Sequence, residues 1–323
     1  MNATMTGFLR FAMAVVTMTA SLSAETEAVR HIGGLPGVRK RAMGKLIRTD
    51  QGLTFEERGA STFVYAAQIV KVSIDDERNL KGGFFGEFLR TGIPFAGGLG
   101  IGMSGLSESF GSVPFAFCLL ATAFMQSHSH VLTVEYFDPH DGYHGAVFIM
   151  SRHAAEDIQR QFTSGVVPPK VEQPKNGCPA IITDPHSIVM LPVSSQVAEI
   201  PGEYRVLTYE HVFETLQRKV SVWHVRRLGD PNDLAVCGEW KLTITVNAFH
   251  KGNAVERALI GPIGQFVGVT NLSCRIVLNN SRGDSLLDED VKAAIRGDRE
   301  SLDLGDVVSK AIARKIRKVV DQS

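Results

Sequence analysis

The chain has 323 residues, and its 34 Lys and Arg residues balance its 34 Asp and Glu residues, so its formal net charge is zero. This balance gives no electrostatic reason to expect nucleic acid or anionic lipid headgroups as partners. Four cysteines without a Cys-x-x-Cys pair are too few for a disulfide framework in a chain of this length, and they indicate no zinc knuckle.

Residues 1–24 have the layout of a cleavable signal peptide. One basic residue, Arg10, precedes an apolar stretch at 11–22, and Ser23 and Ala24 are small residues before Glu25. The stretch is shorter than the roughly 20 residues of a membrane-spanning helix, although an uncleaved anchor is the alternative. No Cys follows it, so a bacterial lipid anchor is not expected there. We expect an exported protein, periplasmic or membrane-associated in the cell envelope, that begins near Glu25.

The next part of the chain has the alternation of half-buried strands. Strands are predicted at residues 44–49, 53–57, 62–65, 69–74, 130–137 and 145–150, with turns at 50–52 and 138–142. A closing helix is predicted at 153–162, where Ala154, Ile158 and Phe162 are four residues apart on one face. The spacing predicts a first domain over residues 44–165.

An apolar insertion at residues 82–126 interrupts these strands. Its only charged residues are Glu87, Arg90 and Glu108, and Glu108 divides its apolar part into two arms of nearly equal length. Each arm is at the lower length limit of a membrane span, so a helical hairpin entering a bilayer is one interpretation. A loop that covers the domain or a subunit interface is the other. The residues predicted to contact membrane or partner are Phe95, Leu99, Leu106, Phe110, Phe115, Leu119, Leu120 and Phe124.

Two patterns that suggest a cofactor or metal have simpler interpretations. Gly100, Gly102 and Gly105 match Gly-x-Gly-x-x-Gly, but they lie among other glycines and outside a strand–helix unit, so no nucleotide is expected. His128 and His130 lie on one strand, and a strand of about seven residues separates them from His140, Asp141 and His144. That separation is roughly 23 Å along a strand, so we expect solvated histidines and no metal site. No catalytic motif occurs, so catalytic and cofactor-binding residues are predicted to be absent.

Residues 166–180 contain four prolines and no hydrophobic period, which predicts a linker. A second domain is then expected at 181–323, with strands at 187–193, 220–225, 234–249, 267–278 and 286–295 and helices at 203–219 and 307–319. Because this pattern contains its own apolar positions, the second half is predicted to fold alone. Cys237 and Cys274 fall on two strands expected to be neighbours; a disulfide and two buried thiols are both open.

Two resemblances rest on these segments. GKLIRTDQGLTFE, the strand at 69–74, HVLTVEYFDPHDG and HGAVFIM resemble bacterial pleckstrin-homology-like or GRAM-like domains over residues 44–162, which implies a bent β-barrel closed by a helix. IPGEYRVLTYEHVFETL, LTITVNAFHKGNAVER, LSCRIVLNNSRGDSLLDEDVKAAIRG and VVSKAIARKIRKVV resemble a domain of unknown function in exported, outer-membrane-associated bacterial proteins, over residues 181–320. The second resemblance implies binding in the envelope and transfers no catalytic residue.

The expected fold class is α+β, a bent barrel with an apolar insertion and a C-terminal helix, followed by an α/β sandwich domain. The expected function is a non-enzymatic scaffold or adaptor at a membrane surface of the cell envelope. Membrane lipid or an envelope protein is the expected partner, with no nucleic acid, and a homo-oligomer is compatible with the pattern. A carrier of an apolar ligand and a hydrolase of unrecognised type are the alternatives.

Overall fold

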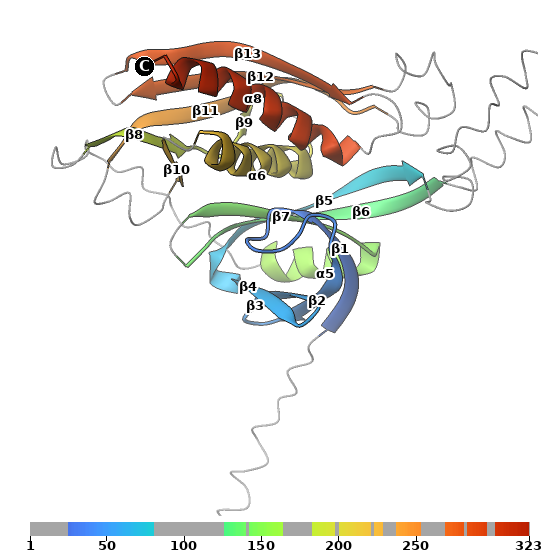
Figure 1. Cartoon of the computed structure of the whole chain (residues 1–323). Coiled ribbons are helices and arrows are strands. Elements are labelled where there is room, and N and C mark those ends of the chain that lie inside the picture. The colour runs from blue at the N-terminus through green and yellow to red at the C-terminus, as the bar shows by residue number, and fades with distance from the viewer. Residues whose placement is uncertain are drawn as a thin grey trace, which may run out of the picture.

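The computed structural model describes residues 25–80, 126–139, 142–163, 183–197, 200–220, 223–228, 237–252, 269–280, 283–295 and 301–322. They form two β-sheets with helix α6 between them (Figure 1). The predicted signal peptide, the linker and the insertion up to residue 125 lie outside these residues.

The first sheet, sheet A, has seven antiparallel strands in the order β4-β3-β2-β1-β7-β6-β5. Helix α5 (Arg152–Thr163) packs on β5 and β6. The strands are β1 (Glu25–Gly33), β2 (Met43–Thr49), β3 (Gly52–Glu57), β4 (Ala60–Tyr65), β5 (Ile69–Leu80), β6 (Gln126–Phe137) and β7 (Tyr143–Met150). All six strands predicted for this part of the chain and its closing helix are confirmed; β1 was not predicted.

The core of this first unit lies between α5 and one face of sheet A. Alternate residues of β6 and β7 point into it, and the residues between them point to the opposite face. Both faces of these two strands are buried, so apolar residues such as Val131 and Val147 also occur on the face opposite this core. The main members of this core are Val29, Leu46, Leu53, Phe55, Val64, Leu132, Val134, Phe148, Ile158 and Phe162.

The predicted bent barrel is wrong, because sheet A is open. Strands β4 and β5 occupy its two opposite edges, although only the short 3-10 helix η1 (Ala66–Gln68) separates them along the chain. Strand β1 lies between β2 and β7, in the middle of the sheet. Its sequence ETEAVRHIG has no clean alternation, and its pairing with β7 shifts register between His31 and Gly33. Local periodicity therefore gave no signal for the strand that sets the sheet order.

The second sheet, sheet B, has the order β10-β8-β11-β12-β13, with β9 also paired to β11. The pairs β10–β8, β8–β11 and β9–β11 are parallel, and β11–β12 and β12–β13 are antiparallel. The strands are β8 (Thr183–Met190), β9 (Ser194–Ser195), β10 (His224–Arg227), β11 (Cys237–His250), β12 (Thr270–Asn280) and β13 (Ser285–Ile295). A 3-10 helix η4 (Ser301–Asp303) leads into α8.

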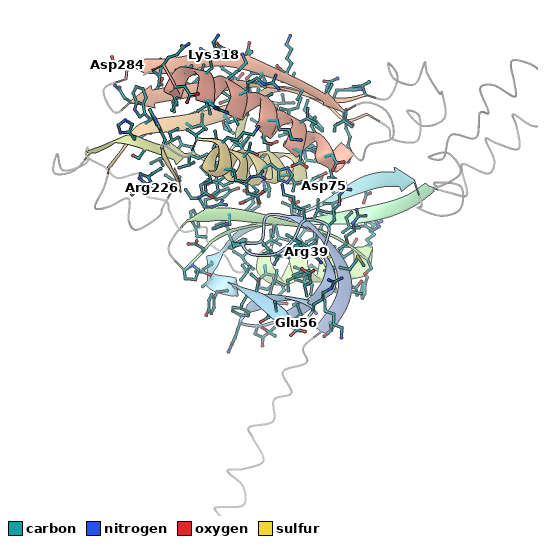
Figure 2. The ribbon with its side chains drawn as sticks, in the orientation of Figure 1. Arg39, Glu56, Asp75, Arg226, Asp284 and Lys318 are labelled. Atoms are coloured by element: carbon teal, nitrogen blue, oxygen red, sulfur yellow. The ribbon has the colours of Figure 1, made fainter. Side chains whose placement is uncertain are left out.

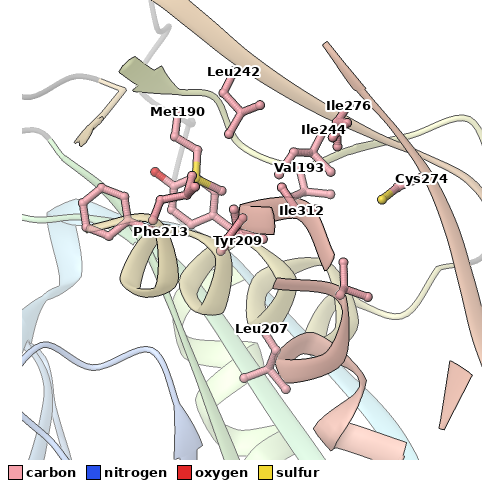
Figure 3. Packing of buried hydrophobic residues seen from close by; sticks show 14 of the residues in the cluster. Met190, Val193, Leu207, Tyr209, Phe213, Leu242, Ile244, Cys274, Ile276 and Ile312 are labelled. Carbon is pink, nitrogen blue, oxygen red and sulfur yellow. The ribbon is translucent and has the colours of Figure 1, made fainter. Parts of the chain in front are cut away.

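Helices α6 (Gly202–Lys219) and α8 (Leu304–Val320) pack against each other and against sheet B. Figure 3 shows the buried cluster that they form with the strands. Met190, Leu242, Ile244, Ile276 and Ile312 are all fully buried in it. The elements of this half occur in the predicted order, apart from the short β9, which was not predicted. The strand expected at 220–225 lies slightly further along the chain, as β10.

The other face of α6 packs on β5, β6 and β7 of sheet A. Thirteen of the 18 residues of α6 are buried, so both faces of the helix are covered except in its exposed last turn. The buried cluster accordingly continues from sheet B through α6 to Ile32, Val131 and Val147 of sheet A. The predicted α/β sandwich is therefore replaced by a second open sheet that shares α6 with the first. Independent folding of the second half stays a prediction.

Strands β5 and β6 continue beyond the rest of sheet A as a two-stranded ribbon. The pairing of β6 with β7 ends at His130 and Met150, whereas its pairing with β5 continues to Leu80 and Gln126. The ribbon points away from the molecule at the right of Figure 1. Its two strands end where the apolar insertion begins and ends.

The pairing register separates Cys237 from Cys274. The two strands are neighbours, as predicted, but Cys274 lies opposite Val246, nine residues along β11 from Cys237. That is roughly 30 Å at ~3.3 Å per residue, far beyond the reach of a disulfide. Cys274 is a buried free thiol, and burial raises its pKa to about 12.

Candidate functional site at the seam beneath helix α6

The surface where α6 meets β5, β6, β7 and β10, called the seam below, holds most of the buried charge of the described residues. Gly145 of β7 allows α6 to lie close to β7, since a Cβ atom at this position would be 2.4 Å from Cγ1 of Val206 on α6. The backbone N–H of Gly145 donates to Oε1 of Glu210 over 3.0 Å. The seam is thus held by backbone as well as side-chain contacts.

We expect Gly145→Ala to lower the free energy of unfolding by about 1–3 kcal/mol, because the added methyl overfills the seam. Val206→Ala should restore part of the loss in the double variant, since it removes the atoms that the new Cβ meets. Urea denaturation of the two single variants and the double variant measures this coupling. Additive losses would show that Val206 does not limit the approach.

A buried ion pair is at the centre of the seam. Arg227 of β10 donates from Nη2 to Oε2 of Glu210 over 2.7 Å and from Nη1 to Oε1 over 2.9 Å. Its Nη1 also donates to the backbone oxygen of Tyr143 on β7 over 2.9 Å. The side chains of Arg227 and Glu210 are 12% and 2% exposed, so the pair is screened from water. One guanidinium therefore connects α6, sheet A and sheet B.

The electrostatics of this pair follow from its burial. Burial raises the pKa of the Glu210 carboxyl, and the charge and hydrogen bonds of Arg227 and the Gly145 N–H oppose that rise. Burial alone would lower the pKa of Arg227, but the Glu210 carboxylate outweighs it and raises that pKa. The guanidinium also lies 3.9 Å from the ring centroid of Phe213, which adds a cation–π contact.

A second ion pair crosses the seam near the first. Arg205 of α6 pairs with Oε1 of Glu135 on β6. The hydroxyl of Tyr143 donates to Oε2 of the same carboxylate over 2.7 Å. Burial and the neighbouring Glu135 raise the pKa of Tyr143, so it stays protonated and keeps donating. Both oxygens of Glu135 are therefore occupied by donors.

His144 is part of this network, and its predicted exposure to solvent is wrong. Its side chain is 7% exposed, its Nε2 lies 3.1 Å from Oδ2 of Asp138, and its ring stacks on Tyr136 at 5.5 Å. Burial, with the charge of Arg227, lowers its pKa to about 4, so the ring is neutral at neutral pH. Its Nδ1 lies 3.8 Å from Oε1 of Glu210.

A further set of contacts joins the segment after β1 to α6 and α8. Lys40 lies 3.1 Å from Glu214 and 3.3 Å from Asp306, and Arg41 lies 2.6 Å from Asp303. His211 lies 3.1 Å from Asp306, and burial lowers its pKa to about 4. These contacts also connect the two units.

The remaining predicted site features are placed as follows. The eight apolar residues of the insertion, from Phe95 to Phe124, lie outside the described residues, as do His140 and Asp141. His128 is in β6, and His130 contacts Asp76 over 2.7 Å. Among the described residues no cluster of metal-ligating side chains forms, and no described helix is long and apolar enough to cross a membrane.

Two hollows among the described residues are either very small or open to solvent. A void of about 10 Å³ lies in the apolar core of sheet A between Leu46, Phe55 and Phe148, too small for a ligand. An open hollow of about 400 Å³ is lined by Gln217, Trp223, His224, Val225 and Arg226. It contains no carboxylate or nucleophile, so its lining does not supply an acid, a base and a nucleophile together.

Sequence reasoning missed the seam. Glu135 is a single charge in the segment VLTVEYF, which is a weak signal of a buried pair. Glu210 lies between Arg205 and Glu214 of α6, a helix with several charged residues, and gave no such signal. Their partners Arg205 and Arg227 are on other elements, and nothing in the sequence pairs them.

No protein-family model and no curated protein sequence matches this chain. Two solved structures titled as PelC dodecamers from Paraburkholderia phytofirmans each cover 45% of this chain and 93% of their own, with 12% and 11% identity and TM-scores of 0.32 and 0.31. A structure titled as an uncharacterized protein has 12% identity and a TM-score of 0.27, covering 42% of this chain and 91% of its own. Similarity this low supports no argument about this protein.

Proposed function

We propose that this protein is a non-enzymatic scaffold or adaptor that acts at a membrane surface of the cell envelope. The observation that carries the proposal is the β5–β6 ribbon, which joins the apolar insertion to the body of the protein. The ribbon ends at Leu80 and Gln126, beyond the last pair of β6 with β7, so the insertion is attached away from the core of sheet A. An apolar segment held in this way fits contact with lipid or with an envelope protein better than contact with the protein's own core.

The seam supports the same proposal. Its charged groups join α6 to both sheets, through Glu210 with Arg227 and Glu135 with Arg205. Groups engaged in this way hold two units in one orientation, which is what a scaffold requires. Export, with a mature chain beginning near Glu25, and self-association are further parts of the proposal.

The test removes the insertion and keeps the ribbon. Replacing residues 81–125 by Asn-Gly connects Leu80 directly to Gln126, which pair in the ribbon, through a two-residue hairpin turn. We expect this variant to stay with the soluble fraction in liposome flotation while the full chain floats. Its thermal transition should change little, because the deleted residues follow the paired ends of the strands.

Two outcomes would contradict the proposal. Flotation of the deletion variant at the level of the full chain would place membrane contact elsewhere on the protein. Loss of the cooperative transition on deletion would show that the insertion packs on the body, as a lid or an interface loop would.

A further inference from the structure

Helix α6 has a second buried carboxylate, which lacks a hydrogen-bonded arginine like the Arg227 that pairs with Glu210. Glu203 lies in the first turn of the helix and is fully buried. Neither of its carboxylate oxygens receives a hydrogen bond from a donor group within the described part of the chain. A buried carboxylate left unsatisfied is costly, so a further chemical group or a proton must compensate it.

The surroundings of Glu203 are polar but supply little compensation. The helix presses on β5 at this point, since a Cβ on Gly202 would lie 2.5 Å from Oγ of Ser73. Oγ of Ser73 and Oγ1 of Thr133 on β6 also have no hydrogen-bond partner among the described residues. Nζ of Lys251, just after β11, is 3.9 Å from Oε1 of Glu203, beyond hydrogen-bond distance, and donates instead to the backbone oxygen of Asp76 over 2.7 Å.

Burial raises the pKa of Glu203, and the neighbouring group that raises it further, through a hydrogen bond and its charge, is the carboxyl of Asp75 on β5. Figure 2 shows Asp75 beside the end of α6, where β5 starts to leave the body of the molecule. Two ionised carboxylates offer only acceptors to each other. One proton between them would make one carboxyl a donor and the other an acceptor, which satisfies an oxygen of each.

We propose that Glu203 and Asp75 share one proton that fastens the start of α6 to β5, and that loss of this proton loosens the seam at the base of the ribbon. The two carboxyls thus form a pH-sensitive latch between the units. The latch is independent of whether the insertion contacts a membrane.

Burial and the neighbouring groups together favour holding the proton. Burial is the largest effect that raises the pKa of Glu203 well above its usual value, and Asp75 raises it further. Lys251 and the N-terminal dipole of α6 oppose the rise. The other charged neighbours are already paired, since Asp76 contacts His130 and Glu135 contacts Arg205. Next to Glu203 in α6, the ring of Tyr204 packs on that of Phe249 of β11, with the ring centroids 4.7 Å apart.

The sign of the pH dependence follows from the raised pKa. A group that binds its proton more tightly in the folded state stabilises the fold fully below its unfolded pKa. That contribution is lost as the pH rises through the folded pKa, which here lies above the usual carboxyl value. The latch is therefore closed in mild acid and opens toward alkaline pH.

Glu203→Gln tests the latch, because an amide is neutral at every pH. We expect the melting temperature of the variant to equal that of the parent at about pH 5 and to exceed it by several degrees at about pH 9. Glu210→Gln on the same helix is the matched control. Its carboxylate is paired with Arg227, so that variant should melt lower than the parent at both pH values.

Infrared spectroscopy supplies a readout that does not depend on unfolding. The parent should show the C=O band of a protonated carboxyl at neutral pH, and the band should be absent in Glu203→Gln. A Glu203→Gln variant that melts below the parent at about pH 9 would overturn the proposal, because Lys251 would then be stabilising an ionised Glu203. Stabilisation of the parent, but not of the variant, by Mg²⁺ or Ca²⁺ would also overturn it, since the carboxyls would then hold a metal.

Discussion

Arg227→Met is expected to lower the free energy of unfolding by about 3–5 kcal/mol, because it leaves Glu210 buried without its partner. The methionine fills a similar volume, so loss of charge rather than loss of packing dominates. Urea denaturation followed by circular dichroism measures the change. A second variant, Glu210→Leu with Arg227→Met, should recover most of the stability, because it removes both charges together.

Arg275→Met is the matched control for this experiment. Arg275 makes a similar two-bond contact with Asp288, at 2.7 and 2.6 Å, but the two side chains are 56% and 40% exposed. Water solvates both groups after the pair is broken, so little stability should be lost. Equal losses for the Arg227 and Arg275 variants would show that burial of the seam pair contributes nothing to its effect.

Leu99→Arg and Leu120→Arg are expected to release the protein from liposomes without unfolding it. Each substitution places a charge in one arm of the insertion, at a cost of about 2.5–3.5 kcal/mol at the centre of a bilayer. Flotation and thermal unfolding are measured on the same variants. Ser61→Arg adds the same charge at an exposed position on β4 and should alter neither property.

The opposite combination of results would end the membrane hypothesis. If the insertion covers the body of the protein, the two arginine variants would lose thermal stability and still float as the parent does. The hairpin deletion and these substitutions therefore test the same proposal through different changes, one removing apolar surface and the other adding charge to it.

The sequence by itself determined most of the secondary structure. Alternation predicted the strands from β2 to β7, and a helical stripe predicted α5, α6 and α8, because these periods record which side of an element is buried. These features are local, so a single sequence contains them.

Tertiary structure alone decided how these elements are arranged. The place of β1 in the middle of sheet A keeps β4 and β5 at opposite edges, and strand order depends on hydrogen bonds between distant segments. The stripe on α6 predicted one buried face, but the second face is covered by strands more than 50 residues away in sequence. The pairing of Glu210 with Arg227 and the lack of a hydrogen-bond donor to Glu203 follow from that packing, because burial determines which charges need partners.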